Sequence, residues 1–277
     1  MTIPYLYAAS LSLGAAIFVI EALISLAGRR RLMDVRDVFA NLAVFAVYLV
    51  IATFYARWLV GIYIKVSDHA VAHVTTGGWH TGENGLWWEW VVVFLLEDLA
   101  FYWFHRASHR IGLFWASHVT HHSSRHYNLS VALRQTWVPF TGFVFWLPLI
   151  LLGLDPLMVL TCQALSLAYQ ELLHTRLAPR LGPLEWILNT PRHHAVHHGS
   201  NGPYLDKNYG GVLIVWDHLF GTYAREEEPI RFGLTHDLGT ANPILIALHE
   251  WGALFHDVFH AGSPRRALRR VLGPPVG

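Results

Sequence analysis

Long apolar stretches alternate with short polar segments in the N-terminal part of the chain. Residues 5–27 form an apolar run whose one charge is Glu21, and a second run covers about 38–64. A helix crosses the hydrocarbon core of a bilayer in about 20 residues, so both runs are long enough to span a membrane. A signal peptide is the alternative for 5–27, but no Lys or Arg precedes the run and no small-residue cleavage site follows it.

Three further stretches continue this pattern. Residues 86–104 read as a third span, with aromatic side chains at both ends and carboxylates that include Asp98. Carboxylates inside a span are costly and usually functional. Residues 137–153 and 155–173 form an apolar hairpin that either crosses the membrane twice or is re-entrant. The pattern therefore predicts an all-α integral membrane protein with four or five transmembrane helices and a cytosolic helical cap.

Composition strengthens the membrane assignment. Hydrophobic residues make up 53% of the chain and charged residues 14%, against about 25% charged residues in a typical soluble domain. The formal net charge of +1 gives no reason to expect a nucleic-acid partner. Because Cys162 is the single cysteine, neither a disulfide framework nor a CxxC zinc site is possible, and we expect a buried, inert thiol.

Basic residues in the loops predict the orientation. The 28–36 segment contains four arginines, whereas the 65–85 segment contains only Lys65. We therefore expect the N-terminus outside and residues 28–36, 105–135 and the C-terminal region on the cytoplasmic face, at the inner membrane if the protein is bacterial. The expected units are a transmembrane hairpin over 1–64, a catalytic domain over 86–225, and a cytosolic tail over 226–277 with a frayed basic end.

Histidine is unusually frequent, with 19 residues, as many as Asp and Glu together. Dense clusters occur at 105–122 and 193–198, with a single histidine between them, and all lie on the predicted cytoplasmic face. The spacings i, i+4 and i, i+3, i+4 put each group on one face of a helix. Neutral imidazole binds metal at physiological pH. Nine histidines can serve two metals at about four or five ligands each: His105, His109, His118, His121, His122, His174, His194, His197 and His198.

Spacing alone is not sufficient to identify a ligand. His69 and His73 share the i, i+4 spacing, but they fall in the segment placed on the outer face, away from the other histidines. We therefore do not expect this pair to bind the same metals.

The type of metal follows from the ligands. Structural zinc prefers four ligands and often thiolates, which this chain does not offer. The HExxH pattern of metalloproteases is absent, because WGALFH follows His249-Glu250. A redox metal with open positions, hence iron, fits best and suggests dioxygen activation beside the bilayer. The alternatives are a membrane zinc hydrolase, which would act without oxygen, and a non-catalytic metal-binding or transport protein, which would carry polar residues through its spans.

Other polar residues are candidates for an outer layer around the metals. A metal-bound histidine usually passes its second N–H to a carboxylate or a carbonyl. The candidates for this role, or for additional ligands, are His193, Asp98, Glu171 and Asp217, with Asp206 as a weaker one. Helix packing, turns and caps are the alternative roles for the carboxylates.

These boxes carry a family resemblance. HxxxH at 105–109, HxxHH at 118–122 and HxxHH at 194–198, together with YQELLHT and NTPRHHAVHHGSNGPYLDKNYGG, resemble the fatty acid hydroxylase/sterol desaturase superfamily of membrane di-iron proteins. Over roughly 95–225 the chain looks like the alkylglycerol monooxygenase branch and its bacterial relatives. The resemblance implies two irons held by the boxes and His174, and dioxygen as oxidant. It also implies an external reductant, which is tetrahydrobiopterin in that branch; the chain contains no GxGxxG nucleotide motif.

The chain departs from that branch at several positions. Arg110 follows the first box where an acidic residue is expected, and Glu171-Leu172 replaces bulky apolar residues. His126 and His218 stand where other residue types are usual. These departures concern the substrate and the reductant more than the metals.

The sequence therefore predicts a membrane oxygenase that hydroxylates a fatty acyl, alkyl-ether or sterol C–H bond. The lipid would enter from the bilayer through a slot lined by Phe101, Trp103 and Trp137. The electron donor would be a separate protein or a reduced pterin. Desaturation or C-4 methyl oxidation at the same centre is the alternative reaction, because the ligands alone do not select the outcome.

Overall fold

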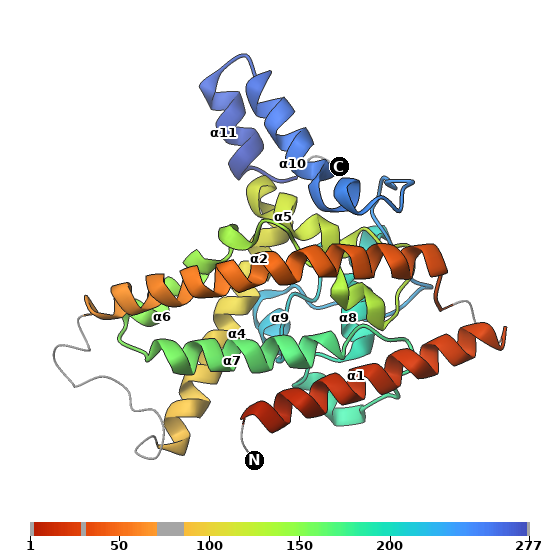
Figure 1. Cartoon of the computed structure of the whole chain (residues 1–277), viewed down its shortest axis with the longest axis horizontal. Coiled ribbons are helices and arrows are strands. Elements are labelled where there is room, and N and C mark those ends of the chain that lie inside the picture. The colour runs from red at the N-terminus through yellow and green to blue at the C-terminus, as the bar shows by residue number, and fades with distance from the viewer. Residues whose placement is uncertain (1–2, 29–31, 71–85, 276–277) are drawn as a thin grey trace.

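The chain is mostly helical in the computed structural model, which describes residues 3–28, 32–70 and 86–275 (Figure 1). Among these residues there is no β-strand, only the isolated bridges Leu188–Leu213 and Gly199–Phe232. The all-α prediction is confirmed. The α-helices are α1 (Ile3–Leu26), α2 (Val35–Ser67), α4 (Trp87–Arg110), α5 (Gly112–His122), α6 (Leu147–Leu151), α7 (Pro156–Glu171), α8 (Pro191–His197), α9 (Val215–Phe220), α10 (Pro243–Phe259) and α11 (Pro264–Leu272). The 3-10 helices are η2 (Leu129–Leu133), η3 (Pro139–Thr141), η4 (Phe143–Phe145), η5 (Gly182–Trp186) and η6 (Gly202–Tyr204).

Several helices begin at a capping side chain. Asp34 accepts a hydrogen bond from the backbone N–H of Asp37 at the start of α2. Asp155 and Asn242 do the same for α7 and α10, each directly before a proline at the first helical position. A capping oxygen satisfies an N–H that has no partner inside the helix, and proline has no N–H to satisfy. These local signals decide where the helices begin.

In the part of the chain that the structure describes, two helices are long and apolar enough to cross a membrane, namely α1, over Ala9–Leu26, and α2. Only 11% and 17% of the residues in these stretches are buried, so most of their apolar side chains face outward rather than into a protein core. Residues 137–153 do not form one continuous helix, because η3, η4 and α6 break them into short pieces. The expected fourth span is therefore not a single helix.

A hydrophobic core joins α2, α4, α6 and α7. Tyr63, Val93, Ile150 and Met158 are completely buried there, and Cys162 is also buried, as expected. Helix α1 lies along α7, where the Ser10 hydroxyl donates to the carbonyl of Ala168 (3.0 Å; Figure 1). This arrangement fixes the C-terminal end of α4, which contains His105 and His109, and that of α7, which His174 follows.

Glu21, the one charge of the first apolar run, is completely buried. It accepts hydrogen bonds from the backbone N–H of Leu129 (2.8 Å) and the hydroxyl of Thr175 (2.6 Å). Thr175 directly follows His174, so Glu21 ties the first helix to the segment that carries this histidine.

The C-terminal region is folded rather than frayed. Helix α10 packs on α5 and α2, and α11 turns back along α10 (Figure 1). The N–H of Gly112, at the start of α5, donates to the carbonyl of Gly273 (2.9 Å). A Cβ at residue 112 would lie 2.5 Å from the Arg270 carbonyl oxygen, so only glycine permits this close approach. The prediction of a frayed basic end is wrong because these contacts order it.

Candidate metal centre

Four segments bring histidine side chains into one buried region. Helix α4 contributes two histidines, α5 three, and α8 with its last cap residue three more, while one follows the end of α7. The i, i+3 and i+4 spacings in the sequence become shared helix faces, as expected. All nine predicted histidines come together.

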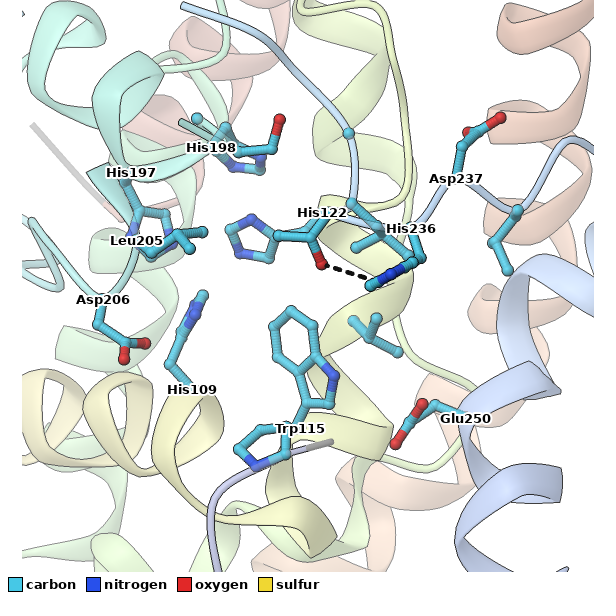
Figure 2. A pocket seen from close by; sticks show the side chains of 18 of the residues that line it. His109, Trp115, His122, His197, His198, Leu205, Asp206, His236, Asp237 and Glu250 are labelled. Carbon is cyan, nitrogen blue, oxygen red and sulfur yellow. Dashed lines mark hydrogen bonds between the residues drawn. The ribbon is translucent and has the colours of Figure 1, made fainter. Parts of the chain in front are cut away.

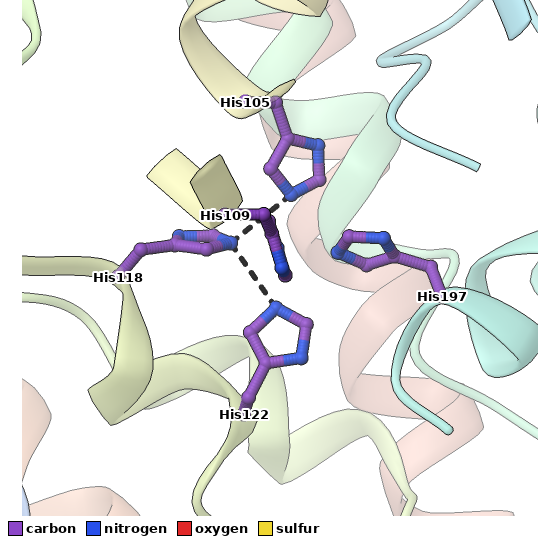
Figure 3. Close-up of side chains that lie close together, drawn as sticks. All are labelled: His105, His109, His118, His122 and His197. Carbon is purple, nitrogen blue, oxygen red and sulfur yellow. Dashed lines mark hydrogen bonds between the residues drawn. The ribbon is translucent and has the colours of Figure 1, made fainter. Parts of the chain in front are cut away.

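The nine side chains form two groups. Within each group, one ligand nitrogen from every histidine lies within 4.8 Å of the others. Each group is therefore compact enough to surround a single metal ion. Figure 3 shows the first, whose imidazoles converge from α4, α5 and α8. The five-histidine cluster consists of His105, His109, His118, His122 and His197, and the four-histidine cluster of His121, His174, His194 and His198.

Backbone carbonyls orient three of these rings. Nδ1 of His105 lies 2.8 Å from the carbonyl oxygen of Tyr209, and Nδ1 of His197 lies 2.8 Å from that of Lys207. Nδ1 of His174 lies 3.0 Å from the carbonyl oxygen of Gln170. A carbonyl oxygen only accepts, so in each neutral ring Nδ1 carries the proton and Nε2 has a free lone pair. The lone pairs of these three rings point into the clusters.

The inward nitrogen atoms crowd together. Nε2 of His118 lies 3.0 Å from that of His105 and 3.1 Å from that of His122. In the other cluster, Nε2 of His174 lies 3.0 Å from that of His121 and 3.0 Å from that of His194. Nε2 of His174 carries a lone pair and no proton. It therefore cannot donate a hydrogen bond to His121 or to His194. A central cation would satisfy several such lone pairs at once, and hydrogen bonds cannot.

Three ring nitrogen atoms of the nine histidines are buried without a hydrogen-bond partner. Nε2 of His109 and Nε2 of His197 belong to the five-histidine cluster, and Nδ1 of His194 belongs to the four-histidine cluster. An unpaired buried polar atom costs free energy, so its presence calls for an explanation such as an ion. The donor set therefore fits a metal ion on chemical grounds.

Burial also keeps the imidazoles in their ligating form. Desolvation lowers the pKa of His174 and of His197 to about 4. The same effect, reinforced by neighbouring histidines, lowers the pKa of the other seven histidines well below the usual value. Neutral imidazole, not imidazolium, donates a lone pair to a metal. At neutral pH the clusters are therefore ready to bind.

Asp98 and Asp217 support the site through the backbone. Asp217 accepts hydrogen bonds from the N–H groups of Tyr209 (2.8 Å) and Gly210 (2.7 Å). Asp98 accepts from the N–H groups of Val212 (2.8 Å) and Leu213 (3.1 Å) and from the indole of Trp216 (2.9 Å). The two carboxylates thus fix the 209–213 loop, whose Tyr209 carbonyl receives the His105 N–H. The two carboxylates therefore bond the backbone that supports a histidine, whereas we expected them to bond the histidine ring itself.

Glu171 and His193 also differ from the expectation. Glu171 approaches His174 through its backbone carbonyl (3.3 Å) rather than its carboxylate. His193 belongs to neither cluster: its Nδ1 lies 3.3 Å from the hydroxyl of Thr190, and its ring lies against Tyr223. Burial lowers the pKa of His193 to about 4.

Sequence reasoning missed two other supports. The Arg134 guanidinium is buried and bonds the carboxylate of Asp37, the amide oxygen of Asn41 and the hydroxyl of Ser123. Ser123 directly follows His122, so this network fixes the end of α5. A single buried arginine gives no sequence pattern that would have revealed the role. The backbone carbonyls that accept hydrogen bonds from the histidines could not be predicted either, because every residue has one.

His69, one of the two histidines of the SDHAVAH segment, lies apart from both clusters. His69 is exposed, and its Nδ1 lies 2.8 Å from the carbonyl oxygen of Lys65, four residues earlier. It belongs to neither cluster. His73 lies outside the described residues.

A cavity of about 660 Å³ reaches the five-histidine cluster (Figure 2). His109, His122 and His197 line it, as does His198 of the four-histidine cluster, and the Trp115 ring lies beside His109 and His122. The ion pair of Arg110 and Asp206 (2.7 Å) borders it. Its other walls come from the 233–238 loop, α10 and the segment after α11.

The cavity that reaches the histidines does not coincide with the slot expected at Phe101, Trp103 and Trp137, because none of the three lines it. Phe101 is in the core, Trp103 is exposed beside Phe220, and Trp137 donates to the Val44 carbonyl on α2.

Comparison with known proteins agrees with the histidine boxes. Residues 90–222 match the family model named fatty acid hydroxylase. Alkylglycerol monooxygenase of Homo sapiens is 48% identical over 164 residues, which are 59% of this chain and 37% of that protein. The protein of the same name in Caenorhabditis elegans is 38% identical over 175 residues, 62% of this chain and 35% of that protein. Ornithine lipid hydroxylase OlsE of Rhizobium tropici is 29% identical over 150 residues, 50% of this chain and 43% of that protein.

The predicted family resemblance is confirmed. The matching part corresponds to little more than a third of the alkylglycerol monooxygenases. No solved structure matches the chain.

Proposed function

Because this chain carries the fatty acid hydroxylase match over residues 90–222 and gathers nine histidines in two clusters, we propose that it is a membrane-bound di-iron oxygenase that hydroxylates a lipid C–H bond. The observation that carries the proposal is the pair of compact all-imidazole clusters. Neither contains a thiolate or a carboxylate, and together they offer the number of ligands that two metals need.

Iron, when bound, would supply the dioxygen chemistry. One oxygen atom enters the C–H bond and the other leaves as water, with two electrons and two protons from an external reductant. The protein's part is to hold neutral imidazoles in fixed orientations. The Tyr209, Lys207 and Gln170 carbonyls do this by accepting the Nδ1–H groups of three ligands.

We infer that the substrate is a lipid. The names of the relatives, alkylglycerol monooxygenase and ornithine lipid hydroxylase, support an alkyl or acyl chain as the hydroxylated group. The cavity at the five-histidine cluster has polar walls at Arg110 and Asp206 and apolar ones at Trp115 and Leu205, which suits a polar head followed by a chain. Desaturation or methyl oxidation at the same centre is the competing outcome.

We place the clusters at the cytoplasmic face of the membrane, which would be the inner membrane in a bacterium. The basic 28–36 segment between α1 and α2 supports that side, although Arg29, Arg30 and Arg31 are outside the described residues. Helices α1 and α2 would cross fully. The broken 137–153 stretch and α7 would form a re-entrant hairpin, because no piece of 137–153 is long enough to cross alone. Helix α4 would bring His105 and His109 to the surface.

The electron donor would be external, either a separate protein or a reduced pterin such as tetrahydrobiopterin. The pterin is what the resemblance to the alkylglycerol monooxygenase branch implies.

Metal analysis and turnover of the purified protein test the proposal. We expect about two irons per chain and, with a reductant and isotopically labelled dioxygen, one labelled oxygen atom in the lipid product. A product that has lost two hydrogens would indicate desaturation instead. Iron far below this ratio, together with unchanged turnover in His121→Ala, would reject the di-iron assignment.

A further inference from the structure

The outward face of α10 is apolar along its whole length. Ile244, Leu248, Phe255 and Phe259 follow at helical spacing and are 57%, 37%, 54% and 82% exposed. The opposite face is buried against α5 and α2. A continuous apolar stripe is uncommon on a surface that faces water and indicates a contact surface.

Helix α11, which packs on α10, adds positive charge to the same hairpin. Leu268 and Leu272 are 59% and 54% exposed, one helical turn apart. Arg265, Arg266 and Arg269 are also exposed on the same short helix. A face that combines leucine with arginine complements an anionic, partly apolar surface.

The two helices form a fixed hairpin. Arg270 donates to the carboxylates of Glu250 (2.8 Å) and Asp257 (2.8 Å) on α10. The hairpin projects from the body on the side of α2 that is opposite α1 and α7 (Figure 1). Its apolar stripe is therefore presented outward on a rigid support.

The hairpin also meets α2 at a defined depth. The 33 residues of α2 measure about 50 Å, whereas the hydrocarbon core is about 30 Å thick, so an α2 centred in the bilayer would extend about 10 Å beyond the core at each end. Ile246 of α10 packs on Ala40 and Val44. These residues lie roughly 8 and 14 Å from the first residue of α2. Helix α10 therefore meets α2 at the level of the bilayer surface.

We infer that the α10–α11 hairpin is an interfacial element that lies in the anionic lipid headgroup layer. Its phenylalanine and leucine side chains enter the acyl boundary, and Arg265, Arg266 and Arg269 bind lipid phosphates. The inference rests on the proposed crossing of the membrane by α2. The segment 226–277, which we expected to be a cytosolic tail, would then provide a second membrane contact.

This placement bears on access to the metals. His249 and Glu250, on the inner side of α10, line the cavity that reaches His109 and His122. The helix that contacts lipid is therefore also a wall of the cavity.

Fluorescence quenching in lipid nanodiscs tests the inference. Cys162 is the single cysteine, so Cys162→Ala allows one environment-sensitive label at Phe259→Cys in the iron-loaded full chain. The comparison label is at Glu227→Cys, an exposed acidic position outside the hairpin. In discs with phosphatidylglycerol, a nitroxide carried near the lipid headgroup should quench the label at 259 several-fold more than that at 227.

Charge variants test the arginines. Arg265→Gln, Arg266→Gln and Arg269→Gln together should reduce quenching at 259 in anionic discs to the level found in pure phosphatidylcholine. Arg231→Gln, at another exposed arginine, should leave it unchanged. A triple variant that quenches like the parent would overturn the role of the arginines.

A third label separates the failure of this inference from the failure of the proposed topology. Phe54→Cys lies on the exposed face of α2 and should be quenched by nitroxides deep in the acyl chains. If 54 is quenched and 259 is not, the hairpin does not contact lipid. If neither is quenched, α2 does not cross and both proposals fail. The label at 259 could instead be protected from both lipid and aqueous quenchers, with the labels of two chains close enough to interact with each other. That result would show that a second copy of the chain covers the stripe, and the lipid inference would be wrong.

Discussion

His122 and His198 stack on each other, with ring centroids 4.3 Å apart and planes 22° from parallel, although they belong to different clusters. His122 belongs to the five-histidine cluster, whereas its chain neighbour His121 belongs to the four-histidine cluster. His198 belongs to the four-histidine cluster, whereas its neighbour His197 belongs to the five-histidine cluster. Each HH pair thus sends one imidazole to each side. The stacked rings form the wall between the clusters, so the two sites share one scaffold.

Single substitutions in one HH pair should therefore empty different sites. We expect His121→Ala to lose the ion of the four-histidine cluster and His122→Ala that of the five-histidine cluster. Each would lower iron from about two to about one per chain, because a missing ligand weakens one coordination set. Elemental analysis measures the ratio, and the exposed His69→Ala serves as the control with unchanged iron. Full iron in His122→Ala would exclude it as a ligand.

Asp217→Asn should weaken the five-histidine cluster without touching a ligand. Asp217 holds the N–H groups of Tyr209 and Gly210, and the Tyr209 carbonyl orients His105. Loss of such outer support costs about 10-fold in metal affinity at its lower limit. A chelator titration measures this effect. Asp237→Asn, at an exposed ion pair with Arg125, should leave the affinity unchanged.

The two arginine–aspartate pairs should differ sharply in their effect on stability. Arg134→Met leaves Asp37 without its buried partner and should lower the free energy of unfolding by about 3–5 kcal/mol. Arg125→Met breaks the pair with Asp237, in which the arginine is 65% exposed, and should cost less than about 1 kcal/mol. Denaturation in detergent compares the variants. Equal losses would show that the Arg134 network is not structural.

Gly112→Ala should loosen the C-terminal hairpin. The added Cβ would meet the backbone carbonyl of Arg270, which cannot move as a side chain can, and we expect a loss of about 1–3 kcal/mol. Gly252→Ala is the matched variant, since nothing lies within 4 Å of its Cβ. It should be neutral or stabilise α10 by up to about 1 kcal/mol. Limited proteolysis after residue 240 should increase only in Gly112→Ala.

The metal-free protein should lose stability in mild acid. The pKa of His174 and of His197 is about 4 in the folded chain, against 6.5 when exposed, so the unfolded chain binds more protons between these values. Stability is then fully present above about pH 6.5 and falls as the pH approaches 4. Thermal unfolding of metal-free protein across this range measures the slope. A flat profile between pH 7 and 5 would show that the buried histidines are not the titrating groups.

The sequence by itself determined the candidate histidines and the helical class. Histidine spacing of i, i+3 and i+4 maps directly onto helix faces, so eight of the nine candidates could be grouped from the sequence, and His174 was added as a single residue. The apolar lengths of α1 and α2 and the Asp-Pro and Asn-Pro caps are equally local signals. Such features depend on residues within one or two turns, which is why they can be read without a fold.

Only the tertiary structure decided how the ligands divide and what supports them. The separation of His121 from His122 depends on where α7 and α8 deliver His174, His194 and His198 against α5. The supports at Tyr209, Lys207 and Gln170 are backbone carbonyls, which every residue has. Glu21 and Arg134 act across more than 90 residues of sequence. Contacts between distant segments leave no periodic pattern in the chain, because they are fixed by packing rather than by local geometry.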